Sequence, residues 1–252
     1  MDLMWWHYVL LMLSGVAAGF MNVMAGGGSM LTVPVMVFLG LPGPVANGSN
    51  RIAIVAQSIT AVTTFFSKGF SDFRLSVTLA LCAVPGAVLG AMAGVRLQGE
   101  WFNRVLAVVL LFVMVMLWRK GSTKQQSDAQ PVSKRRLLAA HALMVGVGFY
   151  GGFIQIGVGF LLIGVLANVL NLDLVRVNMH KVFIAGSFNL AALIVYAVNV
   201  PLVWALGLTL AVGNSVGGWL GAQTSVNKGE SAIKWVLNAV LVVFIIKLLF
   251  FT

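Results

Sequence analysis

Residues 105–118 read VLAVVLLFVMVMLW, a run of apolar side chains with no charge and no turn-forming residue. The chain as a whole is similar, with 60% hydrophobic and 9% charged residues among its 252. Soluble domains carry about 25% charged residues, so most of this surface must face lipid. Only helices and closed barrels satisfy the backbone in hydrocarbon, and the short alternating segments of a barrel are missing. We therefore expect an all-α, polytopic membrane protein.

The segment that follows this run is polar and basic. Residues 119–136 hold six Lys and Arg, together with Ser, Gln and one Pro, as expected of a flexible linker. It divides the chain into a first transmembrane repeat (1–118), the linker (119–136) and a second repeat (137–252). The apolar segments lie at 5–25, 29–40, 51–67, 75–95 and 101–118, and again at 137–156, 160–171, 180–198, 201–222 and 232–250.

The second half repeats the motifs of the first in the same order, as in many secondary transporters. If all five segments of each half cross the membrane, the repeats are inverted and 12 of the 16 Lys and Arg face the linker side. If the first two segments of each half count as one crossing, the repeats are parallel and 9 of the 16 do so. The positive-inside rule favours inversion, with four to five segments per repeat and a cytoplasmic linker. One constant shift aligns Gly15 with Gly146, Gly26 with Gly157, Gly28 with Gly159 and Asn47 with Asn178, and a short deletion then aligns Gly86, Gly90 and Gly94 with Gly213, Gly217 and Gly221.

The strongest local motif is AGGGSM at residues 25–30, between two apolar segments. Glycines at membrane depth break a helix and let the backbone approach a ligand. A helix that starts at Ser29 would point unpaired N–H groups and a positive dipole end at the break, as re-entrant or broken transporter helices do toward anions. The alternative is that these glycines only permit close helix packing. The predicted site residues at the two breaks are Asn22, Gly26, Gly27, Gly28 and Ser29, and then Gln155, Gly157 and Gly159.

Three glycines spaced by four residues form a small-residue face in each half. We expect these faces to serve helix packing. On the binding interpretation of the first break, a side chain at Gly28 abolishes transport. One at Gly90, on a packing face, mainly alters stability.

Polar residues also begin the third apolar segment of each half, where amide side chains recur near one helix face. Such side chains are costly in lipid and should face the protein interior. Each half places a cation there, Arg51 and Lys181, which either attracts an anion or snorkels to the interface. His180 is an anion contact, a proton relay or an ordinary interfacial residue. The predicted side-chain contacts are Asn47, Asn50, Arg51 and Gln57, and then Asn178, His180 and Lys181.

The functional groups that the chain lacks exclude several classes of protein. All six acidic residues fall at segment ends or in loops, which disfavours a cation as substrate. Cys82 is the only cysteine, and no protease, hydrolase or phosphate-loop motif is present. The net charge of +10 reflects basic cytoplasmic residues rather than a nucleic-acid partner. We therefore expect no enzyme, no cofactor and no metal site.

The order and duplication of these motifs carry a family resemblance. The motifs are Gly15, Gly26–Ser29, Pro34, Asn47 and Asn50, repeated as Gly146, Gly157–Gly159, Asn178 and Lys181, with residues 198–204 (VNVPLVW) before the last glycine face. Over nearly the whole chain this pattern resembles the sulfite exporter TauE/SafE family. The resemblance implies a permease of the bacterial inner membrane for sulfite, sulfonates and related organic anions.

These observations together predict a secondary transporter that moves a small anion, sulfite or an organosulfonate, by alternating access. Its partners are that anion and the lipid bilayer, and a homodimer remains open. The alternatives are a non-transporting assembly or signalling subunit, and a carrier for a different small solute.

Overall fold

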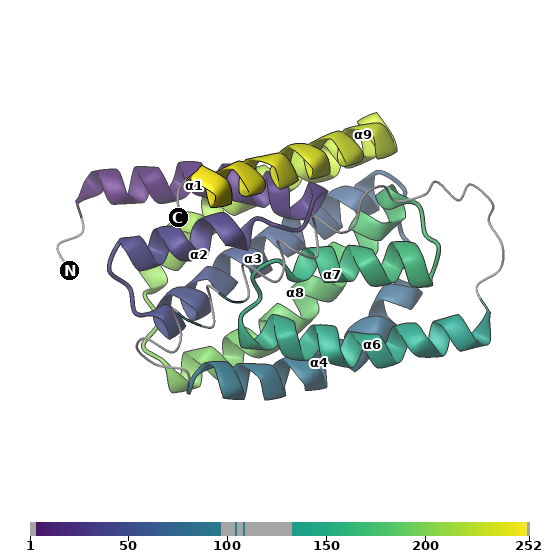
Figure 1. Cartoon of the computed structure of the whole chain (residues 1–252), viewed down its shortest axis with the longest axis horizontal. Coiled ribbons are helices and arrows are strands. Elements are labelled where there is room, and N and C mark those ends of the chain that lie inside the picture. Colours follow the sequence, from purple (N-terminus) through teal and green to yellow (C-terminus); the bar gives the residue numbers. More distant parts are fainter. Residues whose placement is uncertain (1–3, 97–103, 105–107, 109–132, 251–252) are drawn as a thin grey trace.

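The computed structural model describes residues 4–96, 104, 108 and 133–250, and this part of the chain contains helices and no strand. The predicted segment 101–118 and most of the linker lie outside the described residues. The helices are α1 (Trp5–Met24), α2 (Ser29–Phe38), α3 (Gly43–Ser67), α4 (Phe73–Gly94), α6 (Lys134–Phe153), α7 (Val158–Gly164) with the π-turn η1 (Val165–Val169), α8 (Leu174–Asn199) and α9 (Trp204–Phe250) (Figure 1).

Two helices begin earlier than their apolar runs predict. α3 starts at Gly43 instead of residue 51, directly after the extended Pro42. α8 starts at Leu174 instead of residue 180, because the side chain of Asp173 caps it and accepts hydrogen bonds from the next backbone N–H groups. The polar residues that seemed to precede these helices therefore lie inside them.

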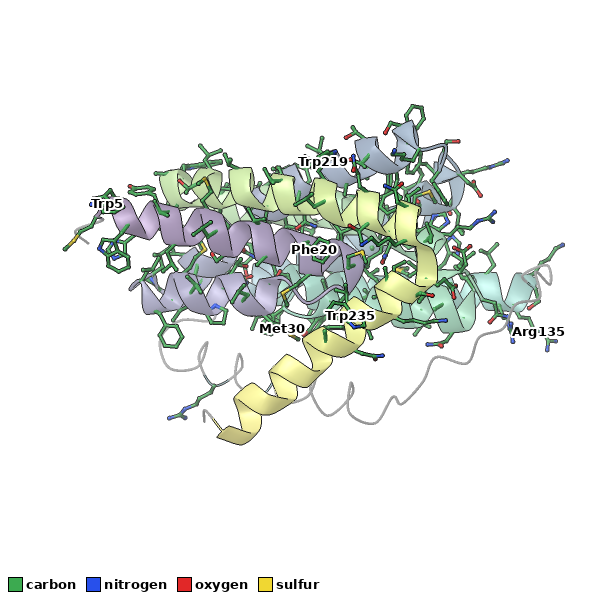
Figure 2. The ribbon with its side chains drawn as sticks, turned by 90° about the horizontal axis from the view of Figure 1, so that it is seen from above. Trp5, Phe20, Met30, Arg135, Trp219 and Trp235 are labelled. Carbon is green, nitrogen blue, oxygen red and sulfur yellow. The ribbon has the colours of Figure 1, made fainter. Side chains whose placement is uncertain are left out.

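The two last predicted segments form one element, α9, which is interrupted at a single residue. Gly229 has φ 64° and ψ −158°, a conformation outside the helical region that glycine adopts easily. The part of α9 beyond Gly229, which carries Trp235, turns back and runs obliquely across the other helices in the view of Figure 2.

The long helices run in two opposite directions. α1 and α3 both pack along α9. In each case later residues of one helix contact later residues of α9, over residues 12–23 of α1 and 49–57 of α3, so these three helices are parallel. Likewise, α4 packs in parallel along residues 145–153 of α6 and 180–196 of α8. α3 and α8 are antiparallel, because the start of α3 contacts the end of α8.

This arrangement gives the molecule two ends, visible at the left and right of Figure 1. At the N-terminal end α1, α3 and α9 begin, and at the linker end α4, α6 and α8 begin. Trp5 and Arg135 mark these opposite ends in Figure 2. Most described basic residues outside the core lie near the linker end, namely Lys68, Arg74, Lys134, Arg135, Arg136, Arg176, Lys228 and Lys234.

The distribution of polar and apolar side chains is that of a membrane protein. Within the described residues, α1, α4, α6 and α8 are long and apolar enough to cross a membrane, and α2 and α7 with η1 are shorter apolar helices. Leu81, Leu138 and Ile194 are more than half exposed, whereas Arg51 and Lys181 are buried. Apolar side chains thus face outward, and two cations lie in the core.

The glycine faces serve packing, as predicted. The α4 glycines lie against the backbone of α6, and those at the start of α9 lie against the backbone of α1. A side chain at Gly90 would collide with the carbonyl of Phe149. Close contact between helix backbones is the usual role of such small-residue faces in membranes.

Candidate functional site

The two helix breaks predicted from the sequence meet in the middle of the molecule. Gly26 has φ +90° and Gly157 has φ +73°, values that glycine adopts without strain. A Cβ atom built on Gly26 would lie only 2.6 Å from the Cα of Gly159. The backbones of the α1–α2 break and the α6–α7 break are therefore in direct contact.

A small polar cavity lies beside this contact. The centre of a water molecule can occupy about 20 Å³ of this cavity, so the cavity has room for about one water. An anion larger than water therefore needs more space than the cavity has in this conformation. The cavity is lined by Asn22, Ser29, Ile54, Gln57, Ser58, Gln155, Val158, Gly159, Lys181, Val182, Ala185 and Asn189.

Lys181 is the charged residue of the cavity wall. It is 1% exposed, and its Nζ donates to the carbonyl of Val23 at 2.7 Å and to Asn178 Oδ1 at 2.8 Å. An ammonium group has three N–H donors, so one donor remains beyond these two hydrogen bonds. Among the described acidic residues, none forms an ion pair with it. Within the described residues, the hydrogen-bond partners of its charged group are thus neutral oxygen atoms.

Arg51 is buried more tightly, with no exposed surface. Its guanidinium donates to the carbonyls of Gly151, at 3.1 Å, and Gly152, and to Asn189 Oδ1 at 2.8 Å. It also stacks over the ring of Tyr196, 4.7 Å from the centroid. Arg51 does not line the cavity, but it holds Asn189, which does.

The two cations play matching structural roles across the halves. Arg51 of the first half binds carbonyls in the last turn of α6, and Lys181 of the second half binds one in the last turn of α1. Carbonyls in the last turn of a helix lack intrahelical partners, and the dipole there is negative. Each buried cation therefore caps the broken helix of the opposite half. Neither is a snorkelling residue.

Amide side chains complete the polar core. Gln57 Oε1 accepts a hydrogen bond from Asn22 at 3.1 Å and lies 3.5 Å from the amide nitrogen of Asn214. Asn178, which orients Lys181, donates to Ser225 at 3.3 Å. These groups lie on α1, α3, α8 and α9, so helices of both halves contribute to one site.

Among the predicted site residues that do not line the cavity, His180 and Asn47 connect helices instead. His180 faces α4, where its Nδ1 is 2.7 Å from Ser76 Oγ. Asn47 donates to the carbonyl of Phe153 at 3.0 Å and to the hydroxyl of Tyr196 at 2.8 Å. Neither side chain lines the cavity.

Gly28 also proves to be a packing residue. A Cβ atom there would lie 2.8 Å from the Cβ of Asn22 and would collide with the carbonyl of Ala18. Valine at Gly28 would thus disturb the fold, as a side chain at Gly90 would. The comparison of these two positions, which the sequence suggests as a test of the binding site, does not separate binding from folding.

Of the predicted residues, the cavity brings together Asn22, Ser29, Gln57, Gln155, Gly159 and Lys181. The prediction did not include Ser58 and Asn189, which line it, or Asn214, which contacts Gln57. Asn214 stands next to Gly213 in a packing face, and no local pattern separates it from that face. Within the described part of the chain, no group of three His, Cys, Asp or Glu is placed to hold a metal ion.

Arg51→Lys is expected to lower the stability of the folded protein by about 1–3 kcal/mol, because lysine keeps the charge but cannot make the forked contacts to α6 and Asn189. Sulfite affinity per folded molecule should not change, since Arg51 is outside the cavity wall. Thermal melting in detergent, read by size-exclusion chromatography, measures the first effect. Arg176→Lys, at an exposed position, is the control. Equal melting of Arg51→Lys and the parent protein would disprove the capping role.

Comparison with known proteins gives a consistent assignment. A probable membrane transporter protein of Sinorhizobium sp is 26% identical, over 98% of this chain and 94% of its own. A probable membrane transporter of Xylella fastidiosa is 26% identical over 90% and 87%, and the Escherichia coli K12 probable transporter YfcA is 24% identical over 92% and 86%. No solved structure matches the chain. Residues 11–248 match the family model of the sulfite exporter TauE/SafE, so the chain belongs to this family of membrane transporters.

Proposed function

We propose that this protein is a secondary transporter that moves a small anion, sulfite or an organosulfonate, across the bacterial inner membrane by alternating access. The observation that carries the proposal is Lys181, a buried cation on the wall of a cavity between the two halves. Burying a charge is costly unless it is paired. The hydrogen-bond partners of the Lys181 ammonium group are a backbone carbonyl and an amide oxygen, which are both neutral. An anion that enters the cavity would neutralise this charge and accept its third N–H.

The other polar groups of the cavity wall suit the same ligand. Asn22, Ser29 and Ser58 add neutral amide and hydroxyl groups around Lys181. Neutral donors hold the oxygens of a sulfite or sulfonate group without the strong binding of several charges. A transporter must also release its substrate, so one cation among neutral donors fits transport better than permanent capture.

The directions of the helices support two inverted repeats. The sequence repeat pairs α1 with α6, α3 with α8, and α4 with α9. The helices of each pair run in opposite directions, as an in-plane two-fold axis requires. α2 and α7 each turn back at the central contact between Gly26 and Gly159, toward opposite ends of the molecule (Figure 1). We propose that α1–α2 and α6–α7 are re-entrant hairpins and that the halves rock about this contact.

The charge distribution predicts the orientation in the membrane. Because basic residues gather at the linker end, we expect the linker 119–136 to be cytoplasmic and both termini periplasmic. A phosphatase that is active only in the periplasm should work when fused at Thr252 and fail within the linker, whereas a cytoplasmic fluorescent reporter should show the reverse. Finding Thr252 and the linker on the same side would exclude this topology.

Flux into liposomes tests the proposed function directly. The purified protein should accelerate entry of radiolabelled sulfite over protein-free liposomes. A transported anion should also raise the melting temperature, increasingly so as its concentration exceeds its dissociation constant. Sulfoacetate, taurine, thiosulfate and sulfate, tested in parallel, would identify the preferred class. A folded protein with no flux of any of these anions would instead support a non-transporting subunit or another solute.

A further inference from the structure

The start of α3 and the neighbouring Gln155 carry buried polar atoms with no hydrogen-bond partner among the described residues. Both side-chain polar atoms of Asn50 are in this state, as are Asn47 Oδ1, Gln155 Oε1 and Arg51 Nε. Asn50 is 0% exposed, so bulk water does not reach it in this conformation. Leaving such groups unpaired is costly, and native proteins pair them with water or a ligand.

One hydrogen bond links these residues to the cavity wall. Gln155 lines the cavity, and its Nε2 donates to the backbone carbonyl of Asn47 at 3.3 Å. Asn50 follows Asn47 by one helical turn on the same face. The unpaired groups therefore include one on the cavity wall, at Gln155, and others on the first turns of α3, nearer the N-terminal end.

In the second half, the residue equivalent to Asn50 has hydrogen-bond partners. The shift that aligns Asn47 with Asn178 aligns Asn50 with Lys181. Lys181 and Asn178 bond to each other and to further partners, whereas the amide of Asn50 has none. If the halves are related by two-fold symmetry, Asn50 is placed in the first half as Lys181 is in the second.

We propose that Asn50 forms a second, transit subsite for the small hydrated anion, between the Lys181 cavity and the N-terminal end of the protein. Asn50 Nδ2 is the unpaired donor that contacts the anion, and the unpaired amide oxygens hold its water. The assignment of an anion rests on the proposed function. The proposal that a hydrated route runs along α3 does not depend on the proposed function.

The variant Asn50→Leu tells an effect on anion passage apart from an effect on the stability of the fold. Because Asn50 has no partner to lose, leucine should leave the melting temperature unchanged or raise it. Sulfite flux per folded protein should fall about tenfold or more, since an apolar side chain of similar size blocks the route. Asn47→Leu is the matched control on the same helix. It removes two hydrogen bonds and should lower the melting temperature by several degrees. Asn50→Leu with normal flux, or with a loss of stability like that of Asn47→Leu, would overturn the subsite.

Thiol labelling tests the route without any substrate. Cys82 is the only cysteine, so Asn50→Cys in a Cys82→Ala background carries a single thiol. An anionic methanethiosulfonate reagent, added on the side of the N-terminal end, should modify it about tenfold or more faster than Ile52→Cys, which packs against α9 at similar depth. Equal rates, or modification only from the linker side, would refute the route. A parent protein without flux of sulfite or any of the other tested anions would refute the proposed function and leave the labelling result standing.

Discussion

Lys181→Gln is expected to insert and purify like the parent protein but to bind sulfite about 10- to 100-fold more weakly. A hydrogen bond to a charged group contributes about 1.5–3 kcal/mol, and each 1.4 kcal/mol is a tenfold change in affinity. Glutamine can still donate to the carbonyl of Val23, so the end of α1 keeps a partner. Lys181→Arg should be partly tolerated, because the charge remains while its shape changes.

The control for Lys181 is Arg176→Gln, on the same helix. Arg176 is exposed and paired with Asp173, so this change removes the same formal charge without touching the cavity. Isothermal titration or a ligand-induced melting shift measures affinity in each variant. Unchanged sulfite affinity in Lys181→Gln would reduce Lys181 to a cap for α1. An equal loss in Arg176→Gln would point to the general field of the protein instead of direct contact.

Periodic and compositional signals in the sequence predicted the helical membrane class and the bounds of several helices well. Apolar runs place α1, α2 and α4 within a few residues of their observed bounds, because lipid demands long apolar helices whatever their partners. The predicted start of α3, at residue 51, was wrong because the first residues of the helix are polar. They look like a loop, yet helices of both halves enclose them. Burial of that kind depends on tertiary contacts that hydropathy does not record.

The candidate site was predictable only in part. Glycine runs identify the breaks, and buried polarity identifies Lys181 and Gln57 on the cavity wall. The sequence does not tell whether a glycine faces a ligand or another backbone, so Gly28 was assigned to binding although it packs against α1. Asn189 lies two turns beyond Lys181 on α8, and its part in the site depends on Arg51, which comes from the other half.

Gly159→Val is expected to prevent the recovery of folded protein. A Cβ atom at this position would collide with the Cα of Gly26, and backbone atoms cannot swing aside as a flexible side chain can. Overpacking of a core costs about 1–3 kcal/mol when side chains can adjust, and the cost should be higher here because both helix breaks would have to move. Gly146→Ala is the matched control, because a Cβ there meets nothing within 4 Å. It should change stability by about 1 kcal/mol or less. Recovery and melting of each variant by size-exclusion chromatography in detergent make the comparison. If Gly159→Val elutes and melts like the parent protein, the two breaks are not in contact, and the proposed pivot between the halves must lie elsewhere.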